Sequence, residues 1–527
     1  MERFKVLVAD PLPEGSVNKL REVADVEASY KLPKEELMEK ISHINALVVR
    51  SETKVTKEIL EPARKLQVIA RAGVGVDNID VEAATRKGIV VINSPEGNTL
   101  AAAEHTMALM LSLSRKIPQA YQSLRSGKWE RSRFVGTELY GKTLGIIGLG
   151  KIGKEVAFRA KSFKMKLLGY DPYLKPEQAA EIEVNLNSLE DLLKKSDFVT
   201  IHVPLGPQTE NLLNSGNLSL MKPGSFLINC ARGGIIDEKA LYESLKNKQI
   251  AGAALDVFAA EPPLNSPLLE LENIVVTPHL GASTQEAQER VAFDVIEQLL
   301  EIFQGKPARS PVNIPSLSQE KLLMMKPYLI LIEKMGSYLS QLCDSPMTEI
   351  QLSYQGEIAK EQTSILTTSA LKGALQKELG SSVNFVNALY LAKTRGVKIQ
   401  ESKSMTSEHY TNLVSIHMKT SDGGHSVSGS VFENKEGMIV ETDGYFLHLG
   451  ISGHKLLTWH EDKSGIIGKV GTCLGGHGIN IAEMQVGRKG AREKAVMILS
   501  VDDPVPLEVL KEIQSLEGIE DARIVTL

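Results

Sequence analysis

The segment Gly148-Leu149-Gly150-Lys151-Ile152-Gly153 constrains this chain most, because of what stands on both sides of it. An apolar run of strand length precedes it, and a helical pattern with an apolar stripe follows. Glycines at this spacing let a strand turn tightly into a helix whose N-terminal amides and dipole hold a pyrophosphate. The context predicts a dinucleotide-binding βαβ unit.

The next strand pattern, residues 166–170, ends at Asp171. A carboxylate about 20 residues after the glycines accepts hydrogen bonds from the adenosine ribose hydroxyls and repels a 2′-phosphate. This residue therefore predicts NAD rather than NADP as the cofactor.

Charge and cysteine usage exclude several classes of protein. The formal net charge of −5 argues against a nucleic-acid or membrane-surface partner, because no basic excess is available to neutralise phosphates. The cysteines, Cys230, Cys343 and Cys473, are few and far apart, which favours a reducing compartment without a disulfide framework or a metal cluster. The first ten residues show no signal-peptide pattern, and Glu104 and His105 interrupt the most apolar helix. We expect a cytoplasmic protein.

Alternating strand and helix patterns predict an α/β fold with two Rossmann-like lobes. We expect a discontinuous substrate-binding lobe at 1–97 and 286–312 and a dinucleotide lobe of about six strands at 98–285. Asn98-Thr99 can cap an apolar helix that extends to Arg115 and is expected to be buried on more than one side, against a second subunit. The segment 310–315 is interpreted as a linker.

The second half of the chain does not show this alternation of strand and helix patterns. Residues 318–450 mix helices, including one over 384–396, with strands of alternating polarity, which predicts an α+β domain. Residues 455–527 follow the order βαββαβ, which is typical of a ferredoxin-like fold.

Three residues of the dinucleotide lobe follow predicted strand ends, the edge at which open α/β sheets bind ligands. They are Arg232, Glu261 and His279. A histidine can remove a hydroxyl proton during hydride transfer, a carboxylate can fix its tautomer, and an arginine can bind a substrate carboxylate. Each also has a structural explanation: a turn histidine, a solvated Arg-Gly-Gly turn, or a loop glutamate before Pro-Pro. Their conjunction favours the catalytic interpretation.

With these motifs the chain resembles the D-2-hydroxyacid dehydrogenase family. The likeness is carried by 70–80 (Ala-Arg-Ala-Gly-Val-Gly-Val-Asp-Asn-Ile-Asp), 127–131, 253–258 and 278–283. The resemblance assigns catalysis to Arg232, Glu261 and His279. With the glycine motif it implies that NAD contacts Val74, Gly148, Gly150, Lys151, Ile152, Gly153, Asp171, Val203, Cys230, Ala231, Asp256 and Gly281. It also implies that the loop 71–75, with Gly73 and Gly75, and Asn98 hold the substrate carboxylate.

Arg50, Arg71 and Arg131 lie in matching motifs at loops expected to face the cleft. Most arginines are simply exposed, but together these three favour a phosphate-bearing acid. The resemblance then implies NAD-dependent oxidation of 3-phospho-D-glycerate to 3-phosphonooxypyruvate, which is the first step of L-serine biosynthesis. Reduction of 2-oxoglutarate is the expected side activity.

The C-terminal unit resembles an ACT domain through residues 459–468 and 478–481. That likeness implies an L-serine effector site at His460, Asp462 and Asn480, although Lys463-Ser464 stands where Arg-Pro is usual. A purely structural dimerisation role is the alternative. We expect a homodimer or homotetramer.

Two other functions fit the same fold. An NADH-sensing, corepressor-like binding protein predicts negligible turnover. A glyoxylate or hydroxypyruvate reductase predicts a preference for the unphosphorylated acid.

Overall fold

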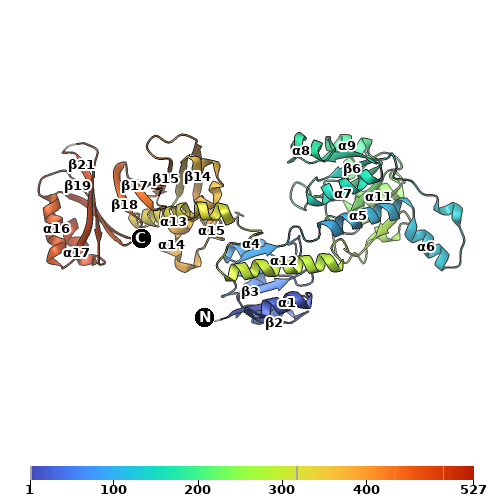
Figure 1. Ribbon diagram of the computed structural model, residues 1–527, viewed down its shortest axis with the longest axis horizontal. Coiled ribbons are helices and arrows are strands. Elements are labelled where there is room, and N and C mark those ends of the chain that lie inside the picture. Colours follow the sequence, from blue (N-terminus) through green and yellow to red (C-terminus); the bar gives the residue numbers. More distant parts are fainter. Residues whose placement is uncertain (1–2, 316–318, 434, 491) are drawn as a thin grey trace.

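The computed structural model describes residues 3–315, 319–433, 435–490 and 492–527. Its strands form four sheets, which follow one another along an elongated molecule (Figure 1). Among the described residues, no helix combines the length and apolarity needed to cross a membrane. The α/β class, the Rossmann-like sheets and the two further α+β units confirm the predicted fold.

The first sheet is entirely parallel, with the strand order β2-β1-β3-β4-β5. Its central strands are short and apolar because both faces are covered. Helix α12, which follows every strand of the second sheet, buries Val295, Ile296 and Leu299 against one face. This lobe is therefore built from two separate stretches of chain. Its elements are β1 (Phe4–Val8), α1 (Glu14–Arg21), β2 (Ala24–Ala28), α2 (Lys34–Ile41), β3 (Ala46–Val49), α3 (Lys57–Leu60), β4 (Val68–Arg71), α4 (Val81–Arg86), β5 (Val90–Asn93) and α12 (Gln285–Phe303).

The segment after α12 is not the free linker that its composition predicted. Val312 N donates to Val91 O at 2.7 Å, and the Asn313 side chain accepts from Val91 N and donates to Ile89 O at 2.9 Å each. Residues 310–313 therefore run along β5 and cover the edge of the first sheet.

The second sheet is also parallel, with the order β12-β11-β10-β9-β6-β7-β8. It has one strand more than expected, because β8 contains only two residues and leaves no periodic signal. Its elements are α5 (Thr99–Ser114), α6 (Ile117–Arg125), η1 (Arg131–Phe134), β6 (Thr143–Ile147), α7 (Lys151–Ser162), β7 (Lys166–Tyr170), α8 (Pro176–Glu181), β8 (Asn185–Leu186), α9 (Leu189–Lys195), β9 (Phe198–Ile201), α10 (Ser215–Leu218), β10 (Phe226–Asn229), α11 (Glu238–Lys246), β11 (Gly252–Leu255), η2 (Pro267–Glu270) and β12 (Ile274–Val276).

The third sheet has the order β14-β13-β15-β16-β17-β18 and carries helices on one face. Helix α15 is shorter than predicted, because Asn384 and Asn387 bond each other's backbone and form a turn instead. The elements are α13 (Gln319–Leu342), β13 (Glu349–Gly356), η3 (Glu357–Lys360), α14 (Thr363–Leu379), η4 (Gly380–Ser382), α15 (Ala388–Thr394), β14 (Lys398–Ser404), β15 (Asn412–Thr420), β16 (Gly423–Val431), β17 (Gly437–Thr442) and β18 (Tyr445–Gly450).

The fourth sheet has the order β20-β21-β19-β22, with every pairing antiparallel, as a ferredoxin-like βαββαβ unit requires. Its two helices cover the outer face, at the end of the molecule (Figure 1). The inner face contributes Leu457, Val496 and Ile498 to the core of the third sheet. Its elements are β19 (His454–Glu461), α16 (Ile466–Gly476), β20 (Ile481–Arg488), β21 (Lys494–Val501), α17 (Leu507–Gln514) and β22 (Ile519–Thr526).

The numerical domain boundaries stay a prediction. Residue 318, the expected start of the third unit, lies outside the described residues.

Helices α13 and α14 cross closely because each presents a glycine to the other. A Cβ on Gly373 would lie 1.9 Å from Glu333 O, and one on Gly336 would lie 2.2 Å from Ala370 O. We predict that Gly373→Ala lowers the free energy of unfolding by about 1–3 kcal/mol, because the backbones must separate. Denaturant unfolding followed by the fluorescence of Trp459, which packs against this core, measures the change.

Gly471 is the matched control, since a Cβ there meets nothing within 4 Å. Gly471→Ala should be neutral or stabilise by up to about 1 kcal/mol. Equal effects of the two substitutions would contradict close packing as the cause.

Candidate active site

Three parallel strands deliver the candidate catalytic residues to the same edge of the second sheet. Arg232 follows β10, Glu261 follows β11 and His279 follows β12. His279 Nδ1 lies 2.8 Å from Glu261 Oε2, and Glu261 Oε1 accepts a hydrogen bond from Phe258 N at 3.1 Å. A backbone amide thus fixes the Glu261 carboxylate, which in turn holds Nδ1 of His279. Nε2 of the exposed imidazole is left available to exchange a proton with a ligand.

His279 has a left-handed backbone, with φ of 57°. A residue other than glycine rarely adopts this conformation unless its surroundings impose it. The surroundings here are Asp256: its carbonyl accepts from His279 N at 2.8 Å, and its carboxylate accepts from Leu280 N at 2.7 Å and Gly281 N at 2.8 Å. Asp256 therefore fixes the conformation of the turn from which the His279 imidazole projects.

The Asp256 carboxylate is buried and also accepts from Thr277 Oγ1 at 2.6 Å, with His105 Nε2 at 3.2 Å. Burial opposes its ionisation, but the hydrogen bonds from His105, Thr277 and Leu280 outweigh burial and lower its pKa. Sequence reasoning did not include His105 or Thr277 in the site. The only signal for His105 was a polar residue within an otherwise apolar helix.

Arg232 reaches from the second lobe to the first. Its Nε donates to Asp77 Oδ2 at 2.9 Å, and its Nη1 donates to Ala231 O at 2.7 Å. Asp77 lies in the loop between β4 and α4, so this ion pair joins the two lobes. Asp77 was missed as a partner of Arg232, because only tertiary structure brings positions 77 and 232 together.

Arg71 lies beside this pair, at the end of β4. Burial, with the charge of Arg232, lowers the pKa of Arg71 to about 10, and its Nε is buried without a hydrogen-bond partner among the described residues. A Cβ on Gly73 would lie 1.5 Å from Arg71 Nη1, and one on Gly75 would lie 1.9 Å from Arg232 Nη2. The two glycines let both guanidinium groups lie against the loop.

Arg50, at the end of β3, adds a third positive charge that acts on Arg71. Its amide is held by Asp10, whereas its side chain makes one long hydrogen bond, from Nη1 to Pro11 O at 3.3 Å. Buried or half-buried arginines gathered in this way favour an anionic ligand.

Asn98 stands at the N-cap of α5, but its side chain makes no capping bond. Its Oδ1 is buried and has no hydrogen-bond partner in the part of the chain that the structure describes. The same holds for Ser94 Oγ a few residues earlier, where the chain passes from the first lobe to the second. Two unsatisfied polar atoms beside the arginines are typical of a site that a ligand completes.

The glycine loop has the geometry of a dinucleotide site. Gly148 has φ of 91°, and a Cβ on Gly153 would lie 2.1 Å from Gly148 O, so both positions exclude side chains. Around Gly150, the N-cap of α7, nothing lies within 4 Å of the corresponding position, which leaves room for a pyrophosphate. Asp171 accepts from Leu149 N and Tyr173 N at 2.9 Å each, so the loop itself aims this carboxylate.

The other expected cofactor residues border the same edge. Lys151 forms an ion pair with Glu96 at 2.6 Å, Ala231 N donates to Asn229 Oδ1, and Asn93 donates to Val74 O. Burial raises the pKa of Cys230 to about 12, so this thiol stays protonated. Ile152 and Val203 are half-buried, and Val203 lies against Gly148.

The structure does not bring Arg131 to this cleft. It is exposed on η1, and the neighbouring Arg133 forms an ion pair with Glu272 at 3.1 Å. Glu272 precedes β12, at the sheet edge opposite to His279, and α6 lies at the end of the second lobe away from the first (Figure 1). Within this chain Arg131 therefore lies away from the cleft, because a sequence motif does not reveal which sheet edge a long connection follows; its role as a substrate contact stays a prediction.

The three expected effector residues each have partners of their own. His460 is buried on β19 and lies 3.3 Å from Thr458 Oγ1. Asp462 accepts from Arg492 N at 3.0 Å and from Arg488 at 3.3 Å, and Asn480 donates to Asp502 at 2.7 Å. The described contacts do not join them into one site.

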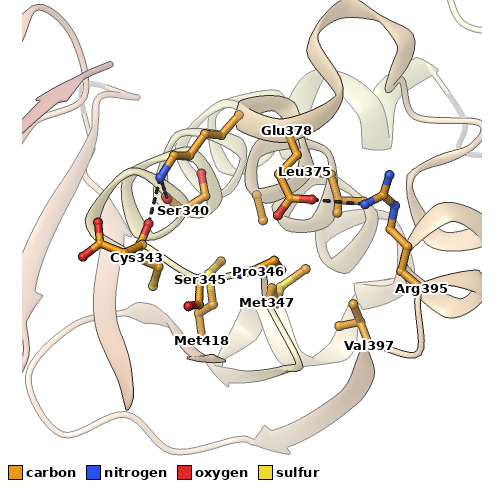
Figure 2. Close-up of a pocket in the computed structure, with 13 residues that line it drawn as sticks. Ser340, Cys343, Ser345, Pro346, Met347, Leu375, Glu378, Arg395, Val397 and Met418 are labelled. Carbon is orange, nitrogen blue, oxygen red and sulfur yellow. Dashed lines mark hydrogen bonds and ion pairs between the residues drawn. The ribbon is translucent and has the colours of Figure 1, made fainter. Parts of the chain in front are cut away.

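A separate pocket of about 400 Å³ lies in the third unit (Figure 2). Lys377 donates there to the carbonyls of Ser340 and Cys343, and Glu378 forms an ion pair with Arg395 at 3.1 Å. Lys377, Glu378 and Arg395 are thus already engaged, whereas in the cleft Arg71 Nε has no hydrogen-bond partner among the described residues.

Comparisons with known proteins agree with this site. Residues 107–281 match the model of the D-isomer specific 2-hydroxyacid dehydrogenase NAD binding domain, 324–443 that of the D-3-phosphoglycerate dehydrogenase intervening domain, and 454–518 that of the ACT domain.

Two curated relatives are similar over nearly the whole length. D-3-phosphoglycerate dehydrogenase of Methanocaldococcus jannaschii is 47% identical over 99% of this chain and 100% of its own length. That of Synechocystis is also 47% identical, over 99% of this chain and 95% of its own length.

Among solved structures, D-lactate dehydrogenase from Aquifex aeolicus complexed with NAD and lactic acid is 29% identical. The match covers 59% of this chain and 100% of the chain of that enzyme, with a TM-score of 0.54. The two lobes with their catalytic edge, the NAD-binding domain and the full-length relatives together show that this chain belongs to the D-3-phosphoglycerate dehydrogenase family of NAD-dependent 2-hydroxyacid dehydrogenases.

Proposed function

We propose that this enzyme oxidises 3-phospho-D-glycerate to 3-phosphonooxypyruvate with NAD, the first step of L-serine biosynthesis. The observation that carries the proposal is the half-buried Arg71, whose buried Nε has no hydrogen-bond partner among the described residues, with Arg232 and Arg50 nearby, close to the His279–Glu261 pair. An acid with two anionic groups, a carboxylate and a phosphate, supplies more counter-charge to these arginines than the single ion pair of Arg232 with Asp77. The full-length relatives named for this activity support the same substrate.

His279 is the proposed base. Its Nδ1 is held by Glu261, so Nε2 accepts the proton of the C2 hydroxyl, and the carboxylate stabilises the resulting imidazolium. NAD, when bound at the glycine loop, would supply the acceptor for the hydride that leaves C2. Glu261 and the Asp256 network hold the ring in place, so little reorganisation accompanies the reaction.

Arg232 is proposed to bind the substrate carboxylate and to polarise the developing carbonyl. Without substrate its guanidinium is paired with Asp77, which is well exposed. This pairing keeps Arg232 extended across the cleft and leaves Nη2 against Gly75. Arg50 and Arg71 are proposed to hold the phosphate and, with the 71–75 loop and Asn98, to fix the acid.

Assembly and regulation are also proposals. Large apolar side chains are exposed on α6, on the segment after it and on α7, which supports a homodimer or homotetramer formed there; they are Ile117, Tyr121, Leu124, Trp129, Val135, Tyr140 and Phe158.

We propose L-serine as effector at the ACT domain, where Asp462 and Asn480 would exchange their present partners. We further propose a cytoplasmic enzyme with 2-oxoglutarate reduction as side activity.

A steady-state assay with 3-phosphoglycerate and NAD tests the proposed reaction. Negligible turnover with intact NADH binding would instead favour the corepressor-like alternative.

We predict that His279→Ala lowers kcat by about 10²- to 10⁴-fold, because general-base catalysis is lost, while NADH binding persists. Steady-state kinetics with an NADH fluorescence titration measures both. His43→Ala, an exposed histidine of the first lobe, is the control and should match the parent enzyme. Full turnover by His279→Ala would remove His279 from the mechanism.

Arg50→Ala should raise KM for 3-phosphoglycerate about 10- to 100-fold, because a charge-assisted hydrogen bond contributes about 1.5–3 kcal/mol. KM for the unphosphorylated acid should change little. Comparing kcat/KM for both acids in this variant and in Arg64→Ala, an exposed control, checks the prediction. Equal losses for both acids would indicate a structural role, and a parent enzyme that prefers the unphosphorylated acid would favour the hydroxypyruvate reductase alternative.

Asp171→Ala should weaken NAD binding about tenfold or more and relax the rejection of NADP, because the ribose hydroxyls lose their acceptor and a 2′-phosphate meets no repulsion. The Kd values of both cofactors, measured by calorimetry, report this change. Asp191→Ala, an exposed control on α9, should leave them unchanged. An unaltered ratio in Asp171→Ala would rule out its role in cofactor choice.

A further inference from the structure

The outer face of the ACT domain carries three potential metal ligands. Cys473 and His477 lie one helical turn apart at the end of α16, and Glu512 lies on the neighbouring α17. One ligand atom from each lies within 4.8 Å of the other two. The sequence predicted no metal cluster because the cysteines are far apart. In the structure a single cysteine, Cys473, lies beside a histidine of its own helix and a glutamate of the neighbouring helix.

The spacing suits a small tetrahedral ion. His477 Nε2 lies 3.5 Å from Glu512 Oε2. Two such ligands, each about 2.0–2.1 Å from a tetrahedral Zn²⁺, are about 3.4 Å apart. The pair therefore needs almost no movement to hold the ion, and the thiol completes a third corner.

The tautomer of His477 also favours a metal ion at this site. His477 Nδ1 lies 2.9 Å from Cys473 O, and a carbonyl only accepts, so Nδ1 carries a hydrogen. In the neutral ring Nε2 then presents a lone pair to a carboxylate oxygen, which is unfavourable unless a cation lies between them. A metal-bound histidine commonly donates its other ring N–H to a backbone carbonyl in this way.

Charge also balances. Cysteine binds a metal as the thiolate, so a divalent ion at this site would meet one thiolate, one carboxylate and one neutral imidazole, which with the ion sum to no net charge. The nearby Lys469 is engaged by Glu517 at 3.3 Å.

We propose that Cys473, His477 and Glu512 bind a divalent transition metal, Zn²⁺ in the first instance, and that the ion joins α16 to α17. The ligands open into a shallow groove of about 500 Å³, so a fourth position is accessible to solvent. Helix α16 contains Gly468, Gly471, Gly475 and Gly476, and a helix with so little intrinsic stability gains from such a link. The site uses none of the expected effector residues and does not depend on the proposed reaction.

Cobalt titration of the untagged, chelator-stripped full chain tests this proposal. We expect one equivalent of Co²⁺ per chain to produce a thiolate-to-cobalt charge-transfer band and tetrahedral d–d absorption, which Zn²⁺ then displaces. Cys473→Ser should abolish the charge-transfer band, while Cys343→Ser, the control for a buried cysteine elsewhere, should keep it. His477→Gln and Glu512→Gln, both exposed and conservative, should each weaken Kd at least tenfold.

Two outcomes would overturn the proposal. Absence of the band shows that the site is a His477–Glu512 ion pair beside a thiol. A band that persists in Cys473→Ser assigns the metal to another cysteine. Neither outcome affects the dehydrogenase reaction, because the titration contains no substrate or NAD.

Discussion

The buried carboxylate of Asp256 organises the catalytic edge of this enzyme. It binds His105 from α5, Thr277 at the end of β12 and the amides of the turn that follows. Removing a charge from water is costly unless several donors replace the water, and here they do. The same contacts fix the turn in which His279 has its left-handed conformation, so the position of the imidazole depends on Asp256.

Positive charge between the lobes is the second constraint. The buried Nε of Arg71 has no hydrogen-bond partner among the described residues, Arg232 crosses to Asp77, and the Arg50 side chain makes a long bond of 3.3 Å to Pro11 O. Mutual repulsion among these cations disfavours the empty arrangement, and an anionic substrate relieves it. Asn98 Oδ1 and Ser94 Oγ, where the chain passes from the first lobe to the second, likewise have no hydrogen-bond partner among the described residues.

The C-terminal half forms a continuous structure of its own. The inner face of the ACT sheet shares a core with the intervening domain, and Arg523 holds Asp344 through two bonds of 2.7 and 2.8 Å. The intervening domain in turn contacts the substrate lobe, where Asn384 donates to Gly88 O at 2.8 Å. Within the described part of the chain, the packed third and fourth sheets therefore lie between the outer helices, α16 and α17, and the first lobe. The proposed metal link acts on the outermost layer of this series.

Local sequence determined much of this protein. The glycine loop with Asp171, the strand ends that carry Arg232, Glu261 and His279, and the βαββαβ order of the last unit were all predictable, because each depends on residues close together in the chain. Tertiary structure alone decided the rest. It paired Arg232 with Asp77 and His105 with Asp256, placed η1 with Arg131 at the opposite sheet edge, bound residues 310–313 to β5, and brought Glu512 to Cys473 and His477. These contacts join segments that are far apart in the sequence. The segments can interact only after the packing of the sheets and helices has brought them close together, so no local pattern in the sequence reveals such contacts.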